Sequence, residues 1–288
     1  MRIIATDLDG TLLNELGEVS VENAYAIRNA KERGIEVVIV TGRPYNSARK
    51  TLQPFELKCP IICLNGAEIH SVEGEIVKDV PLHTIQCQKI KSTCQSENIY
   101  FEFFTNHGVY SDNREGYVQV MIDIMTTVNP DFNKEEIRER ADKRFQNEQF
   151  QFIKNYDDLF SIENLKIYKM LAFSHEKEKL DRIYKQLENE PNLTVTSSAR
   201  GNLEFNHPVA QKGIALRFFA ESRGIEMKEV MAVGDNYNDI TMLQMAGRGV
   251  AMGNAEDEIK KVCSYTTKTN NENGVAYAIQ EVLKEGSE

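Results

Sequence analysis

Short apolar runs alternate with helical segments at both ends of this chain, and this alternation limits the possible folds more than any other feature. Near the N-terminus the sequence predicts strands at residues 3–6, 36–40 and 60–64, and helices at residues 21–33 and from Pro44 onward. Strands that alternate with helices are typical of βαβ units, in which neighbouring strands run parallel. We therefore expect the N-terminal part to build a parallel sheet.

The same alternation returns toward the C-terminus. There the sequence predicts helices at residues 212–223 and 239–245, strands at 230–233 and 250–252, and a last helix after Gly274. Both ends of the chain then contribute to one architecture. The fold class that we expect is α/β, with a Rossmann-like parallel-sheet core.

The middle of the chain has a different texture. Strand-like runs at residues 100–105 and 166–174 alternate there with highly charged helical segments. We predict that residues 83–206 form an inserted α/β domain, while residues 1–82 and 207–288 form the core. Prolines near both boundaries favour extended connections between the two domains.

Composition disfavours several classes of protein. Hydrophobic residues make up 41% and charged residues 27% of the 288 residues, as in globular proteins. No apolar stretch approaches the length of a membrane span, and Asp7 and Asp9 interrupt the N-terminal apolar run before it could be a signal peptide. A formal net charge of -10 disfavours nucleic acid as a partner, because phosphate backbones bind net basic surfaces. The five cysteines form no CxxC pair, which indicates reduced thiols and a cytoplasmic protein.

Polar residues follow the predicted strands at the points where these strands end. Ligands of an open parallel sheet collect outside the carboxyl ends of its strands, so residues at those ends share one crevice although they lie far apart in the sequence. Lys212, at the start of a predicted helix, can join them. The groups at the strand ends are Asp7 and Asp9, Thr41-Gly42-Arg43, Asn65-Gly66, and the run from Gly234 to Asp239.

The acids of this set need positive charge nearby. Two carboxylates about 4 Å apart repel by about 4 kcal/mol at an effective dielectric of about 20, and the further acids Asp235 and Asp239 would add to that cost. Mg²⁺ favours oxygen ligands, keeps several waters and commonly completes its shell with a substrate phosphate. Lys212 would add one fixed positive charge. For Asp7 and Asp9 taken alone, an acidic turn after an edge strand is the alternative.

Four of these segments, in this order, resemble the sequence motifs of the haloacid dehalogenase superfamily. They are Asp7-Leu8-Asp9-Gly10-Thr11, Thr41-Gly42-Arg43, Lys212-Gly213 and Gly234-Asp235-Asn236-Tyr237-Asn238-Asp239. The long insert between the second and third motifs, with Asn65-Gly66-Ala67 before it, is similar to that of the Cof-type phosphatases. The resemblance covers nearly the whole core. It implies that the insert is a large cap domain that closes on small substrates and sets specificity.

The resemblance implies a role for each acid. Asp7 would be the nucleophile that attacks phosphorus and forms an aspartyl-phosphate. Asp9 would protonate the leaving oxygen and later help to deprotonate the water that hydrolyses this intermediate. Mg²⁺ would be held by the carboxylates of Asp7 and Asp235 and by a backbone carbonyl at Asp9. Asp239 would support the shell or bind through water.

Further groups would bind the phosphate. Thr41 can donate its hydroxyl, Gly42 can offer an unobstructed backbone N–H, and the Lys212 ammonium can neutralise both the phosphate and a neighbouring acid. Leu8 would contribute only its backbone N–H. The resemblance further implies that Asn238 presents its amide to the phosphate.

Two residues beside these groups have two interpretations each. Asn65 is either part of an ordinary Asn-Gly turn or part of the site. Arg43 either reaches the substrate or is solvated before a helix.

The third motif departs from the family, whose members often carry Gly-x-x-Lys-Gly, because Lys212-Gly213 follows Gln211 here without the earlier glycine. The charge of Lys212 is retained, and the path of its loop is left open.

The function expected from these residues is Mg²⁺-dependent hydrolysis of small phosphomonoesters. Sugar phosphates are the first substrate class, and flavin mononucleotide and pyridoxal phosphate are others. One alternative is a phosphomutase, which would use the same aspartyl-phosphate. Another is a non-catalytic regulator that binds phosphorylated metabolites, although a regulator has little use for both Asp7 and Asp9. We expect a monomer or a weak homo-oligomer.

Overall fold

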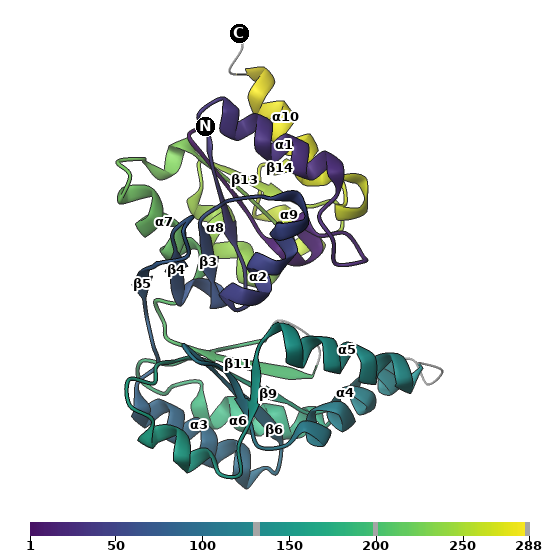
Figure 1. Cartoon of the computed structure of the whole chain (residues 1–288), viewed down its shortest axis with the longest axis vertical. Coiled ribbons are helices and arrows are strands. Elements are labelled where there is room, and N and C mark those ends of the chain that lie inside the picture. Colours follow the sequence, from purple (N-terminus) through teal and green to yellow (C-terminus); the bar gives the residue numbers. More distant parts are fainter. Residues whose placement is uncertain (129–132, 198–200, 286–288) are drawn as a thin grey trace. The chain divides into compact units, whose positions relative to one another are not determined.

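The computed structural model describes residues 1–128, 133–197 and 201–285. The chain divides into two compact units, a core of Met1–Asp79 with Val209–Glu288 and a cap of Val80–Pro208. Both units are drawn in Figure 1. Among the helices of the described residues, none combines the length and the hydropathy that crossing a bilayer requires.

The two units end within two or three residues of the predicted domain boundaries. The sequence places them after residues 82 and 206, and the structure places them after Asp79 and Pro208. Leu82 belongs to the cap because its N–H donates to the carbonyl of Ile167 at 2.7 Å and its side chain packs in the cap's hydrophobic core. On the returning segment, the ring of His207 lies 5.8 Å from that of His83, which is also in the cap.

The core sheet has the expected parallel architecture. Its strands are β1 (Ile3–Thr6), β2 (Glu36–Val40), β3 (Ile61–Cys63), β4 (Glu68–His70), β5 (Ile76–Asp79), β12 (Val230–Gly234), β13 (Arg248–Ala251) and β14 (Tyr265–Thr266). They lie in the order β14-β13-β12-β1-β2-β3-β4-β5. Pairing is parallel from β14 to β3, and β4 and β5 add an antiparallel edge. The prediction of an α/β fold with a parallel-sheet core is confirmed.

Helices pack against this sheet and explain why its central strands are almost entirely apolar. They are α1 (Val21–Glu32), α2 (Tyr45–Leu52), α7 (Lys212–Glu221), α8 (Ile240–Met245), α9 (Asp257–Lys261) and α10 (Gly274–Glu285). Ile3, Ala5 and Val38 share one hydrophobic cluster with residues of α7 and α8. Helix α1 lies beside α10 and contacts β2 (Figure 1). Strands β1 and β12 are buried at every residue, as is typical of parallel strands covered on both faces.

A buried asparagine ties the segment that follows β1 to two helices. Helix α1 begins after Ser20, whose hydroxyl accepts from the N–H of Asn23 at 3.1 Å. The Asn23 amide donates to the carbonyl of Leu12 at 3.1 Å and accepts from the N–H of Ala276 at 2.9 Å. The segment that carries the first motif is therefore anchored to α1 and α10.

The cap is a second α/β unit with a mostly antiparallel sheet. Its strands are β6 (Tyr100–Thr105), β7 (Gly108–Ser111), β8 (Phe150–Phe152), β9 (Ile167–Phe173), β10 (Thr194–Thr196) and β11 (Asn202–Asn206). Its helices are α3 (Thr84–Ser96), α4 (Arg114–Val128), α5 (Lys134–Asn147) and α6 (Lys177–Leu187). The strands lie in the order β10-β11-β9-β6-β7-β8. Residues of α3 and α6 share a hydrophobic cluster with one face of this sheet.

A buried ion pair fixes α5 to the cap sheet. Glu102 of β6 is 0% exposed and accepts two hydrogen bonds from the Arg144 guanidinium, at 2.8 and 2.7 Å. The rings of Tyr117 and Phe150 lie 4.6 and 5.0 Å from that guanidinium. Because the guanidinium lies against these two rings and also pairs with Glu148 at 3.1 Å, we assign this ion pair a structural role in the cap.

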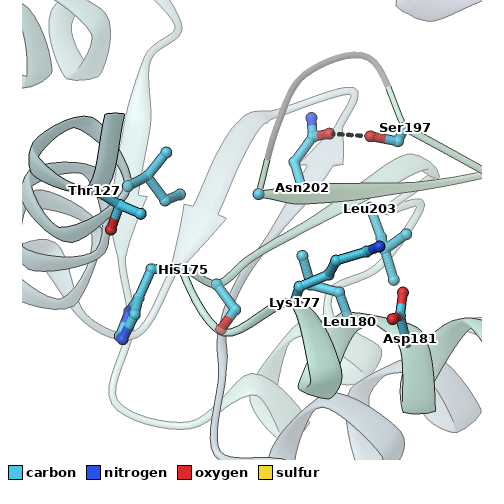
Figure 2. A pocket seen from close by; sticks show the side chains of 11 residues that line it. Thr127, His175, Lys177, Leu180, Asp181, Ser197, Asn202 and Leu203 are labelled. Atoms are coloured by element: carbon cyan, nitrogen blue, oxygen red, sulfur yellow. Dashed lines mark hydrogen bonds between the residues drawn. The ribbon is translucent and has the colours of Figure 1, made fainter. Parts of the chain in front are cut away.

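The cap also contains a pocket of about 350 Å³ beside the start of β11 (Figure 2). On one wall the Ser197 hydroxyl donates to the amide oxygen of Asn202 at 3.0 Å, and Lys177 and Asp181 of α6 stand on another. Gly201 has φ +84°, and a Cβ there would come within 2.9 Å of Ile124 in α4. The residues that line this pocket all belong to the cap, and none of the predicted site residues is among them.

Candidate active site

The first acid, Asp7, stands immediately after β1 at the carboxyl end of the core sheet. Its N–H donates to the carbonyl of Val233 in β12 at 3.0 Å, and the residue is only 4% exposed. The chain then turns at Gly10, where φ is +73°. A Cβ on Gly10 would overlap the carboxylate of Asp235, so only glycine allows the loop to fold back against the fourth motif.

Lys212 lies between two acids. It is the first residue of α7 and is 1% exposed. Its Nζ donates to Oδ1 of Asp7 at 2.8 Å and to Oδ1 of Asp239 at 2.6 Å. The absent glycine of the third motif therefore does not prevent the lysine from reaching Asp7. Gly213 docks the start of α7 against α8, because its N–H donates to the Thr241 hydroxyl at 3.0 Å and a Cβ there would meet the Thr241 backbone.

Asp239 organises the loop that follows β12. Its Oδ2 accepts from the backbone N–H groups of Asp235 and Asn236, at 2.9 and 3.0 Å, while Oδ1 accepts from Lys212. Protein donors thus occupy both oxygens. This arrangement suits a carboxylate that supports a metal shell better than one that ligates the ion directly.

The acids form one cluster. One carboxylate oxygen from each of Asp7, Asp235 and Asp239 lies within 4.8 Å of the others. Burial raises the pKa of Asp7 well above its ordinary value, against the opposing charge of Lys212. Burial also raises the pKa of Asp235 to about 6, although a hydrogen bond of 2.7 Å from the Thr11 hydroxyl acts the other way.

The charge of Lys212 does not balance this cluster. Burial by itself would lower the pKa of Lys212, but Asp239 and Asp7 raise it above its ordinary value, so the ammonium stays protonated. Three carboxyl groups still face this one ammonium, and burial, the largest cause, keeps the pKa values of Asp7 and Asp235 raised. An oxygen-only set of acids in need of further positive charge is the donor set that fits a hard divalent cation.

Asp9 takes a different position. Its side chain is 57% exposed and is held by Arg43. The Arg43 Nε donates to Oδ2 of Asp9 at 2.7 Å, and Nη2 donates to Oδ1. The Asp9 carboxylate is thus not part of the cluster of Asp7, Asp235 and Asp239. The sequence resemblance likewise assigns only the backbone carbonyl of Asp9 to the ion.

Three of the predicted phosphate-binding residues, Thr41, Gly42 and Asn238, lie around Asn65. The Thr41 hydroxyl is buried and accepts from the N–H of Arg43 at 3.1 Å, so its own proton can be donated elsewhere. A Cβ on Gly42 would lie 3.0 Å from the amide oxygen of Asn65, and the Asn238 amide donates to that oxygen at 3.2 Å. Among the described residues, Oδ1 of Asn238 is buried and has no hydrogen-bond partner. Asn65 has φ +59°, so one residue serves both as the turn and as a neighbour of the site.

Sequence reasoning assigned no role to two residues that shape the first-motif loop. Thr11 is fully buried and donates to Asp235, although its place in the DLDGT motif was a usable signal. The amide of Asn254 donates to the carbonyl of Gly10 at 2.8 Å, and no local pattern marks that contact. Leu8, expected to offer its N–H, is buried beside Asp7.

Comparison with known proteins identifies the family. Residues 4–279 match the model of the haloacid dehalogenase-like hydrolases. Phosphatase YwpJ of Bacillus subtilis is 38% identical over 98% of this chain and 100% of its own length. The 5-amino-6-(5-phospho-D-ribitylamino)uracil phosphatase YwtE of the same organism is 35% identical over 98% of both chains. Pyridoxal phosphate phosphatase YbhA of Escherichia coli is 27% identical over 96% of this chain and 97% of its own.

Solved structures agree with these relatives. The structure of a haloacid dehalogenase-like hydrolase from Bacillus subtilis superposes with a TM-score of 0.87 at 38% identity, covering 97% of this chain and 99% of that one. The structure of TM0651 from Thermotoga maritima gives a TM-score of 0.77 at 27% identity, covering 97% of each chain. Because the family match spans core and cap together, this chain belongs to the haloacid dehalogenase-like hydrolases, as one of the phosphatases of that family.

Proposed function

We propose that this chain hydrolyses small phosphomonoesters with Mg²⁺ through an aspartyl-phosphate on Asp7. The observation that carries the proposal is the placement of Asp7, buried at the end of β1 with Lys212 at 2.8 Å and two further acids in one cluster. This buried carboxylate can attack a phosphate dianion, because a fixed ammonium lies beside it and the cluster of acids can bind a divalent cation. A merely structural ion pair would not require the additional acid Asp235.

The donor set assigns the metal ligands. We infer that Mg²⁺ would be held by the carboxylates of Asp7 and Asp235 and by the backbone carbonyl of Asp9, because the ion prefers oxygen ligands and retains several waters. Asp239 supports this shell through Lys212 and the loop N–H groups. When bound, Mg²⁺ would offset the negative charge that develops on the transferring phosphoryl group.

The chemistry then proceeds in two displacements. A carboxylate oxygen of Asp7 forms a bond to phosphorus while the ester oxygen leaves, and Asp9 gives that oxygen its proton. A water molecule next attacks phosphorus of the aspartyl-phosphate, and Asp9 accepts the proton of this water. Inorganic phosphate leaves and the Asp7 carboxylate is restored.

The phosphate itself would be held by neutral and positive donors. We assign this role to the Thr41 hydroxyl, the backbone N–H groups of Leu8 and Gly42, the Lys212 ammonium and the Asn238 amide. The Asn238 amide nitrogen donates to Asn65, and its buried oxygen has no hydrogen-bond partner among the described residues, so turning the nitrogen toward a phosphate would break no hydrogen bond of that oxygen.

The substrate class is a small phosphorylated metabolite. Sugar phosphates, flavin mononucleotide and pyridoxal phosphate remain the classes to test, with the cap as the unit that selects among them. Relatives named as phosphatases of a phosphoribitylamino uracil and of pyridoxal phosphate support small organic phosphates in general. A cytoplasmic setting fits the five cysteines, all of which are free thiols.

A phosphatase panel tests the proposal. Purified protein is assayed for phosphate release from phosphorylated metabolites with Mg²⁺, with EDTA, and as Asp7→Asn. We expect turnover of at least one substrate, which both EDTA and Asp7→Asn abolish, while Asp257→Asn, at an exposed acid of α9, leaves it unchanged. Transfer of the phosphoryl group back to a sugar would identify a mutase instead. Binding without any turnover, together with failure of beryllofluoride to occupy Asp7, would identify a regulator.

A further inference from the structure

Arg43 and Asp9 join the loops that follow two adjacent strands. Arg43 comes after β2, two residues before the start of α2 at Tyr45, and Asp9 comes after β1. The guanidinium meets both carboxylate oxygens, through Nε to Oδ2 at 2.7 Å and through Nη2 to Oδ1. Side-chain exposure is 28% for Arg43 and 57% for Asp9.

Stability is a poor explanation for this pair. An ion pair with this exposure contributes little to folding, because water screens it and both side chains lose conformational freedom. The two-pronged geometry does fix direction, since a planar guanidinium that contacts both oxygens allows the carboxylate only one orientation. Among the described residues, Arg43 is the side chain that hydrogen-bonds the Asp9 carboxylate.

The backbone of Arg43 is itself held by the site. Its N–H donates to the Thr41 hydroxyl at 3.1 Å, and its carbonyl accepts from the N–H of Leu64 at 3.1 Å. Hydrogen bonds therefore hold the backbone from which the guanidinium extends. This turns a contact between two exposed side chains into a geometric link between the phosphate-binding residue Thr41 and the acid Asp9.

We propose that Arg43 is a positioning residue that acts through Asp9, aiming this carboxyl at the leaving oxygen. The inference rests on the proposed phosphatase function. Two separate N–H donors allow Arg43 to keep one oxygen of Asp9 while the other oxygen carries the proton that goes to the leaving group. When the ester bond breaks, that proton passes to the leaving oxygen, and the Asp9 carboxylate is again bound by both donors.

Two substrates with different leaving groups separate this role from direct substrate binding. The p-nitrophenolate of p-nitrophenyl phosphate leaves without needing a proton, whereas the alkoxide of an alkyl phosphomonoester must be protonated. The quantity to compare is kcat/KM, because it reports the steps up to formation of the aspartyl-phosphate and excludes its later hydrolysis. The alkyl substrate is the best one found in the panel above.

Arg43→Gln should lower kcat/KM for the alkyl substrate by about tenfold or more, and for p-nitrophenyl phosphate by no more than about twofold. Arg43→Lys should lower the same kcat/KM values as Arg43→Gln does, because an ammonium keeps the positive charge but cannot contact both oxygens of Asp9 as the planar guanidinium does. Arg49→Gln is the matched control, at an exposed arginine of α2 whose guanidinium contacts Tyr45. It should change neither value, and thermal unfolding should show all variants folded.

A double-variant cycle completes the test. In an Asp9→Asn background, Arg43→Gln should cost no more than about a further twofold on the alkyl substrate, since a residue that acts through Asp9 has nothing left to position. Equal losses on both substrates, or full multiplication of the two single effects, would overturn the proposal and assign Arg43 to substrate binding. Wild-type protein that releases phosphate from neither substrate would instead contradict the proposed phosphatase function.

Discussion

The ammonium of Lys212 lies 2.8 Å from Oδ1 of Asp7, and both side chains are almost completely buried. The same nitrogen lies 2.6 Å from Asp239, so one positive charge serves two acids from different parts of the chain. Removing one partner of a buried ion pair leaves uncompensated charge behind, which costs more than the pair contributes when intact.

Replacement of this lysine tests that arrangement. Lys212→Met should lower the free energy of unfolding by about 3–5 kcal/mol and abolish phosphate release, because two acids lose their counter-charge. The double variant Lys212→Met with Asp239→Asn should regain part of the stability and none of the activity. Urea titration and the phosphatase assay measure the two effects. Unchanged stability in Lys212→Met would contradict the structural argument.

The turn at Gly10 gives a second prediction with a control in the same loop. Gly10 and Gly17 have similar φ values, +73° and +77°, but a Cβ on Gly10 would overlap Asp235, whereas nothing lies within 4 Å of one on Gly17. Both Gly→Ala variants should lose about 1 kcal/mol of stability from the left-handed backbone. Only Gly10→Ala should also lose Mg²⁺ affinity and activity.

Calorimetric titration with Mg²⁺ and denaturant unfolding distinguish the two glycine variants. Gly10→Ala must push Asp235 away or distort the loop, and either change moves a proposed metal ligand. Equal Mg²⁺ affinity in Gly10→Ala and Gly17→Ala would show that the close approach of Gly10 to Asp235 does not matter for the ion.

The order of strands in the sheet determines which residues of this site meet, and this part of the site can be predicted from the sequence. The carboxyl ends of parallel strands share one edge, so the approach of Asp7 and Asp235 follows from the order of elements alone. The docking of α7 on the sheet then brings Lys212 to Asp7. The meeting of the strand-end acids was therefore predictable from backbone architecture, whereas the sequence left open the loop path that carries Lys212 to Asp7.

The contacts that escaped prediction depend on side-chain direction. Examples are the hydrogen bonds from Arg43 to Asp9 and from the Asn238 amide to the amide oxygen of Asn65. They depend on side-chain rotamers and on loops with positive φ values, which no periodic sequence pattern marks. The bounds of the inserted unit differ from the expected ones by two or three residues for a similar reason. The proline at position 81 is typical of an extended segment, but the hydrogen bond from Leu82 to Ile167 and the packing of the Leu82 side chain show to which unit that segment belongs.

The raised pKa of Asp235 predicts a pH-dependent affinity for Mg²⁺. Its value is about 6, against an ordinary 3.8, so folding favours the protonated acid. The contribution of this carboxyl to the stability of metal-free protein is therefore complete below pH 3.8 and is lost as the pH rises through about 6. Mg²⁺ binds the ionised form, so the titration of Asp235 by itself should make the affinity about tenfold weaker at pH 5 than at pH 7, and the raised pKa of the other carboxylate ligand, Asp7, acts in the same direction.

Calorimetry across pH 5 to 7 checks this prediction, and Thr11 supplies its variants. Thr11→Val removes the hydrogen bond that opposes the shift, so the rise in Mg²⁺ affinity should move to higher pH. Thr11→Ser keeps a hydroxyl and should follow the wild type. An affinity that stays flat over this range would show that Asp235 is already ionised at pH 5.

The ion pair inside the cap predicts a stability effect that is independent of catalysis. Arg144→Met removes the counter-charge of Glu102, which is 0% exposed, with its donors at 2.8 and 2.7 Å, and leaves it only the Tyr100 hydroxyl as a side-chain donor among the described residues, so the free energy of unfolding of the cap should fall by about 3–5 kcal/mol. Arg182→Met is the control, because Arg182 binds Glu97 with equally good geometry at the surface and should cause no measurable loss. Urea unfolding followed by tyrosine fluorescence compares the two. Equal stability of both variants would mean that the buried pair, with the Tyr117 and Phe150 rings against its guanidinium, contributes no more to the free energy of unfolding than the surface pair does.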